Sequence, residues 1–162
     1  MKKNKIILML SILVLGVTFL TGCGTKETTN QAENKTVANT LSETFEKEIK
    51  KQKDIEKVSQ TLSESEIIVP ATQTFVVGEE DYLSGFKEEI KGFDKAVGIA
   101  PMIGTIPFIA YVFEVENPKE FAATLEENAQ LNWNICTEAD EMKTTIVDNY
   151  VFFVMSPTSF EE

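Results

Sequence analysis

The sequence predicts an α+β fold: a small antiparallel or mixed sheet with two short helices, preceded by one long N-terminal helix. Three observations support this prediction. Apolar residues recur at helical spacing through residues 36–62, short strand-like runs separated by turn residues follow, and a second helical pattern covers residues 118–131. Sheets of this kind carry helices on one face, and a ferredoxin-like β-α-β-β-α-β path is one candidate.

The first 22 residues are typical of a signal peptide. Lys2, Lys3 and Lys5 precede a mostly apolar run over residues 6–20, which is shorter than the ~20 residues needed to span a bilayer. A plain N-terminal transmembrane anchor is the alternative. Leu20-Thr21-Gly22-Cys23, directly at the end of the apolar run, argues against that alternative.

These four residues resemble a bacterial lipobox. The resemblance implies that a diacylglyceryl group, with fatty acyl chains such as palmitate, is joined to the Cys23 thiol. It also implies cleavage between Gly22 and Cys23, so that Cys23 becomes the mature N-terminus. Two acyl chains would anchor the protein firmly, because each buried methylene contributes ~0.8 kcal/mol. We therefore expect a lipoprotein on the outer, extracytoplasmic face of the cell membrane.

The charge of the chain limits its partners. Removal of residues 1–22 leaves 12 lysines against 26 acids, a formal charge of −14, and the chain has neither Arg nor His. Such a surface repels phosphate backbones, so a nucleic-acid partner is not expected. Anionic lipid headgroups would also repel it, which leaves the diacylglyceryl anchor as the expected membrane attachment.

Residues 23–35 are expected to form a flexible tether that spans roughly 20 Å root-mean-square. In residues 36–62, apolar side chains recur every four residues at first and then drift, between many charged residues. A continuous helix here would be about 40 Å long. It is expected to pack on the folded domain, and a stalk or a dimer seam is the alternative.

The compact domain is expected over residues 63–162. Residues 67–69 and 74–77 are short strand candidates, and residues 79–90 are ambiguous because Gly85 interrupts a helical face. Residues 96–100 and 106–115 are predicted strands joined by a turn. A helix is expected to begin at Pro118, capped by Asn117, and a hairpin over residues 143–155 turns at Asp148-Asn149.

Two of the predicted strands are apolar on both faces. Tyr150, Phe152 and Val154 would point to one face of the sheet, and the intervening residues to the other. Strands of this type are usually covered on both faces. Because two short helices cover only one face, we expect residues 36–62 to fold back over the second.

The C-terminal part resembles a known domain. The residues that carry the resemblance are the block from Tyr82 through Ala100-Pro101-Met102-Ile103-Gly104, residues 109–115, the helix over Phe121–Leu125, and residues 147–155. They are similar to a domain of unknown function found in small lipoproteins of anaerobic Gram-positive bacteria. The resemblance implies a lipid-anchored extracytoplasmic module and brings no catalytic residues.

The sequence offers few candidate catalytic or metal-binding residues. Cys136 is unpaired once Cys23 carries lipid, and we expect it to be buried beside the sheet. Ser84 and Lys87 satisfy the S-x-x-K spacing of penicillin-binding serine enzymes, but the accompanying motifs are missing. Two acidic clusters, residues 79–81 and Glu138 with Asp140 and Glu141, lack the ligand spacing of a calcium loop. We expect no metal and no cofactor.

The sequence therefore predicts location better than activity. The expected function is a lipid-anchored extracytoplasmic protein of unknown biochemical activity, most consistent with a protein-binding or envelope-associated module whose partner is not identified. A structural surface protein is the alternative, followed by an enzyme of unfamiliar chemistry. A solute-binding transporter component is not expected, since a domain of ~90 residues is too small for two lobes.

Overall fold

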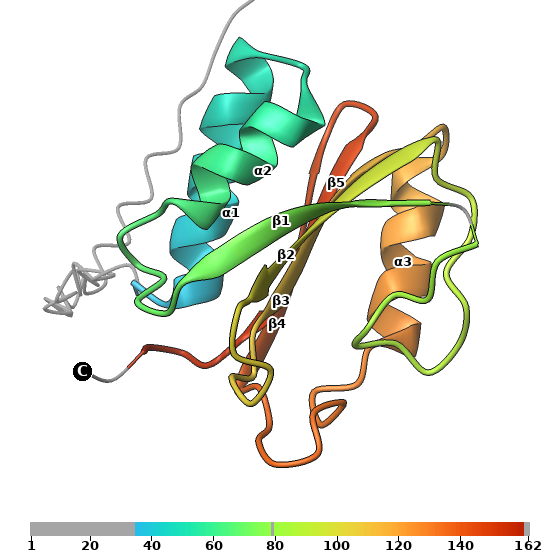
Figure 1. The fold of residues 1–162 in the computed structure, drawn as a ribbon. Coiled ribbons are helices and arrows are strands. Elements are labelled where there is room, and N and C mark those ends of the chain that lie inside the picture. The colour runs from blue at the N-terminus through green and yellow to red at the C-terminus, as the bar shows by residue number, and fades with distance from the viewer. Residues whose placement is uncertain (1–34, 79, 161–162) are drawn as a thin grey trace, which may run out of the picture. The chain divides into compact units, whose positions relative to one another are not determined.

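The computed structural model of the chain describes residues 35–78 and 80–160. These residues form three helices and a five-stranded sheet (Figure 1). The elements in chain order are α1 (Val37–Lys51), α2 (Ile55–Ser63), β1 (Thr72–Val77), β2 (Lys95–Pro101), β3 (Ile109–Glu114), α3 (Pro118–Asn128), β4 (Glu141–Val147) and β5 (Tyr150–Ser156).

All neighbouring strands of the sheet are antiparallel, in the order β1-β2-β3-β5-β4. The first three strands form a meander. The chain then passes through α3 to the outer strand β4 and returns as β5, which lies between β3 and β4. The predicted ferredoxin-like path is therefore wrong, because that path places two parallel strands side by side.

Both faces of the sheet are covered by helices (Figure 1). Helices α1 and α2 lie over one face, where they bury Leu41, Phe45 and Val58 among the inward side chains of the strands. Helix α3 lies over the other face. The strands β3 and β5 supply both cores by alternation. Phe152 and Val154 face α1 and α2, whereas Phe153 and Met155 face α3. The expectation that residues 36–62 cover the second face is thus confirmed.

The single long helix predicted for residues 36–62 is wrong. The helix ends at Lys51, Gln52 adopts an extended conformation, and α2 begins at Ile55. Asp54 causes the restart, because its carboxylate accepts hydrogen bonds from the backbone N–H groups of Glu56 and Lys57. Ile49 and Ile55 are six positions apart, and in a continuous helix this spacing would place them on different faces. The break between α1 and α2 allows both side chains to lie on the same side.

The second short helix, expected within residues 79–90, is not formed by the described residues 80–90. These residues belong to an irregular segment with several turns, defined here as the strap (residues 80–94), which crosses the α3 side of the sheet. Leu83, Phe86 and Ile90 are buried in the α3-side core, so their helix-like spacing reflects burial alone. Gly85 has φ +98°, a conformation that excludes a right-handed helix.

Most other predicted elements agree with the structure. The hairpin β4–β5 turns at Asp148, which has φ 54°, and α3 starts at Pro118. Residues 67–69 do not form the predicted strand. They lie in the connection from α2 to β1, where Ile68 donates its N–H to the carbonyl oxygen of Ser65.

Several segments lie together at one end of the sheet. We call it the proximal end, because the described chain begins there at residue 35. Helix α1 starts at this end, where the N–H of Val37 donates to the carbonyl of Thr158 and the N–H of Ala38 donates to the Glu141 carboxylate. The β2–β3 loop and the α3–β4 connection lie at the same end (Figure 1).

Candidate functional site

The predicted lipidation and cleavage residues, Cys23 and Gly22, lie outside the described residues, and so does the predicted tether up to residue 34. The candidate sites in the described part of the chain are therefore a hollow beside α3, the single described cysteine, two acidic clusters and the open edge of the sheet.

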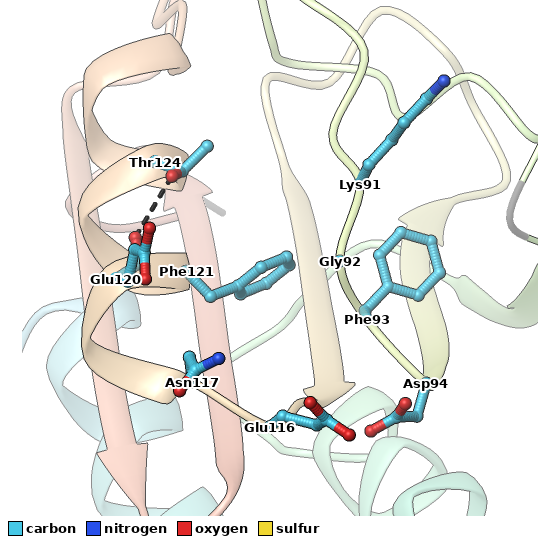
Figure 2. Close-up of a pocket in the computed structure, with 9 residues that line it drawn as sticks. All are labelled: Lys91, Gly92, Phe93, Asp94, Glu116, Asn117, Glu120, Phe121 and Thr124. Atoms are coloured by element: carbon cyan, nitrogen blue, oxygen red, sulfur yellow. Dashed lines mark hydrogen bonds between the residues drawn. The ribbon is translucent and has the colours of Figure 1, made fainter.

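The hollow lies between α3 and the end of the strap and encloses about 360 Å³ (Figure 2). Its floor is aromatic: Phe121 points from α3 toward Gly92 and Phe93, and the Phe121 and Phe93 rings meet edge to face with centroids 6.3 Å apart. The exposed acids Asp94, Glu116 and Glu120 form the rim.

The side chains of the hollow do not form a recognisable catalytic arrangement. Figure 2 shows the carboxylates of Asp94 and Glu116 directed toward one another, whereas Lys91 points away from them. The Thr124 hydroxyl donates to the Glu120 carbonyl oxygen at 3.1 Å and is thus engaged within its own helix. Across the described residues, no cluster of three or more acidic or cysteine side chains is arranged to hold a metal ion.

The prediction that Cys136 is buried is wrong. Cys136 is exposed and free, in the connection between α3 and β4. Ala139, three residues later, is buried instead, and its N–H donates to the carbonyl of Leu131. The connection therefore turns its alanine toward the core and its cysteine toward solvent, an outcome that the apolar character of both residues could not predict.

The S-x-x-K pair has no helix to bring its members together. Ser84 and Lys87 are both exposed, and they belong to the strap, in which the N–H of Lys87 donates to the carbonyl of Asn128. The Ser84 carbonyl oxygen accepts a 3.0 Å hydrogen bond from the hydroxyl of Tyr111. Burial raises the pKa of that hydroxyl, so Tyr111 remains a neutral donor that fastens the strap to the sheet.

Each acidic cluster contains carboxylates that accept hydrogen bonds from backbone N–H groups. Asp81 accepts the N–H of Gly78 at 2.7 Å and thereby closes a turn after β1. In the second cluster, Asp140 accepts the N–H of Thr158, and Glu141 accepts the N–H of Ala38 at 2.9 Å. Glu141 and Asp140 therefore join the start of β4 to the first turn of α1 and to Thr158 at the proximal end. The sequence did not indicate this role, because the bonded residues are distant in the chain.

The two edge strands of the sheet differ in how they are protected. Strand β4 carries Glu141 and Lys143 and contacts α1 and α3. Strand β1 has the sequence TQTFVV without a charged residue, and α2 is the one helix of the described chain that it contacts. Phe75 and Val76 are exposed on it, with Val76 62% exposed. Natural edge strands usually carry charges or bulges that prevent further pairing, and β1 has neither.

The hydrogen-bond phase of β1 identifies the backbone groups on its open side. The N–H of Met102 donates to the carbonyl of Ala71 at 2.8 Å, in continuation of the register that pairs Thr72 with Pro101. Hydrogen-bonded pairs alternate in an antiparallel ladder, so the odd-numbered residues of β1 bond to β2. The N–H and C=O groups of Thr72, Thr74 and Val76 therefore face outward, where no described strand pairs with them.

Comparison with known proteins assigns no family: no family model matches the chain, and neither a curated protein nor a solved structure similar to it is found. The resemblance of the C-terminal part to a lipoprotein domain of unknown function stays a prediction. Within the described residues, none of the helices is both long and apolar enough to cross a membrane.

Proposed function

We propose that this chain is a lipoprotein, anchored through Cys23 on the outer face of the cell membrane, whose folded part binds an extended segment of another protein along β1. The lipid anchor is supported by the basic and apolar leader that ends in Leu20-Thr21-Gly22-Cys23. The binding function is supported by the uncharged, open edge of β1.

The outward N–H and C=O groups of Thr72, Thr74 and Val76 can pair with an added strand, which is a common mode of peptide recognition. The exposed side chains of Phe75 and Val76 lie on opposite faces of that edge and would contact alternate residues of the segment. With a formal charge of −14 on the mature chain, a segment that carries basic residues is favoured.

The test is a photo-crosslinking residue at position 76 of the full chain in the bacterial envelope. The variant Thr74→Pro removes one outward N–H and leaves the ladder with β2 intact, because Thr74 lies at a non-hydrogen-bonded pair. The variant Thr74→Val keeps that N–H and serves as the matched control.

We expect a crosslinked product that maps to one segment of a partner protein, present with Thr74→Val and lost with Thr74→Pro. Crosslinking that is unchanged by Thr74→Pro would show that strand addition is not the mode of binding. A product that contains two copies of this chain would identify self-pairing of β1 instead, and the absence of any product would favour the structural surface protein.

A further inference from the structure

The proximal end carries exposed apolar side chains that do not belong to the core. Met102 and Ile103, at the tip of the β2–β3 loop, are 67% and 64% exposed, and Ile135, in the α3–β4 connection, is 99% exposed. We call these three residues the apolar tip. Loop tips are usually polar, because they face water and their side chains do not contribute to a core.

The two loops that carry the apolar tip are joined by two hydrogen bonds. The side-chain amide of Asn134 donates to the carbonyl of Gly104 at 2.8 Å, and the hydroxyl of Thr137 donates to the carbonyl of Thr105 at 2.7 Å. The N–H of Met102 is held by Ala71 at the start of β1. The two loops that carry the three apolar side chains are therefore held against one another.

The described chain enters the fold at the same end. Helix α1 begins at Val37, which is tied to Thr158, and the next residue is tied to Glu141 at the start of β4 (Figure 1). In the sequence, residues 24–35 separate Cys23 from this point. Twelve residues can span at most about 40 Å. An anchor on Cys23 would therefore keep the proximal end within reach of the membrane surface.

We infer that the apolar tip inserts into the outer surface of the lipid bilayer that carries the anchor, so that the proximal end faces the membrane. This inference rests on the proposed lipid anchor. The anchor would already hold the protein on the bilayer, so that insertion of the apolar tip becomes an intramolecular step. A small apolar surface is therefore sufficient to bias the orientation of the folded part.

Charge determines the class of lipid that suits this contact. Glu138 and Asp140 are exposed beside the tip, and the mature chain carries a formal charge of −14. Anionic headgroups would repel this surface, and the repulsion would be strongest at low ionic strength. Insertion is therefore expected to be strongest in zwitterionic bilayers and to weaken as anionic lipid is added without salt.

The chain contains a reporter for this contact, since Trp133 is its single tryptophan and lies two residues from Ile135. The experiment uses the intact lipidated chain in phosphatidylcholine vesicles, with and without brominated acyl chains that quench tryptophan on contact. Sedimentation of the vesicles measures the anchor independently of the fluorescence.

Brominated lipid is expected to lower Trp133 fluorescence by about two-fold or more, since interfacial segments enter the acyl boundary to a depth of ~5–10 Å. The double variant Ile103→Glu with Ile135→Glu should abolish the quenching while the protein still sediments with the vesicles. The control Ile146→Glu replaces an aliphatic side chain that is 40% exposed on β4, away from the proximal end, and should leave the quenching unchanged.

Vesicle-bound protein without quenching would overturn the insertion and leave the anchor intact. Quenching that survives the double variant would also overturn it, because Trp133 would then contact lipid for another reason. Protein that does not sediment with vesicles would overturn the anchor and the orientation together. Circular dichroism of each variant verifies that the fold is retained.

Discussion

The carboxylate of Glu141, at the start of β4, accepts a 2.9 Å hydrogen bond from the backbone N–H of Ala38 in the first turn of α1. The two residues are 103 positions apart. The contact satisfies one of the N–H groups that a helix leaves unpaired at its start, and it places a negative charge at the positive end of the helix dipole. Glu141 thus joins the first described helix to the outer strand of the sheet.

We expect Glu141→Ala to destabilise the fold by about 1–2 kcal/mol, since it removes both the hydrogen bond and the favourable charge at the helix start. Glu141→Gln should cost less, because its amide oxygen can still accept the N–H of Ala38. Urea denaturation measures both free energies of unfolding. Glu43→Ala, on the exposed side of α1, is the control, and an equal loss for Glu43→Ala and Glu141→Ala would contradict the assignment.

Gly85 allows the strap to lie close against the sheet. It has φ +98°, and a Cβ atom there would collide with the methyl group of Met155. Gly85→Ala should therefore cost more than ~1 kcal/mol. Gly92→Ala, with φ +89° and open space, should cost less, and Gly104→Ala should be nearly neutral. Thermal melts rank the three variants, and any other order would contradict the close packing of the strap.

Removal of α1 and α2 should expose one complete face of the sheet. Six apolar residues of these helices are essentially inaccessible, and each contributes ~1.5–3 kcal/mol when fully buried. They are Leu41, Phe45, Ile49, Ile55, Val58 and Leu62. The fragment Ser63–Glu162 is therefore expected to melt at a lower temperature than Cys23–Glu162, or to dimerise through the exposed face. A monomeric fragment with the same melting temperature would contradict this role of the helices.

Cys136 should react quickly with a thiol reagent in the native protein, because its side chain is exposed. In a Cys23→Ser background, Ellman's reagent is expected to modify one thiol per chain without denaturant, and adding Cys136→Ser should abolish the reaction. Cys136→Ala should change the free energy of unfolding by no more than about 0.5 kcal/mol, as is usual at exposed positions. Modification that requires denaturant would show that the thiol is covered in solution.

The sheet could be predicted from the sequence where local signals were strong. The continuous apolar run over residues 150–155 predicted two buried faces, and Asp148-Asn149 predicted the hairpin turn that the structure shows. The break between α1 and α2 had a signal as well, since the six-residue step from Ile49 to Ile55 does not fit a helical face. Asp54 supplied a cap at the same place.

Other features depend on contacts between distant residues and could not be predicted. The helix-like spacing of Leu83, Phe86 and Ile90 gave no indication that these residues lie in the irregular strap along the end of α3. The exposure of Cys136 depends on how the α3–β4 connection packs against the β2–β3 loop. The apolar tip did have a signal, since Met102 and Ile103 occupy a turn where polar residues are usual.

The proposed anchor and the inferred orientation at the membrane both require a lipid at Cys23, and the mass of the membrane-extracted protein tests for that lipid directly. Mass spectrometry of the N-terminal peptide is expected to show a chain that begins at Cys23 and carries a diacylglyceryl group. Cys23→Ser should retain residues 1–22 or be released from the membrane, whereas Cys136→Ser should behave as the wild type does. A membrane-extracted chain that begins at Met1 with an unmodified Cys23 would contradict the lipid anchor and the orientation inferred from it.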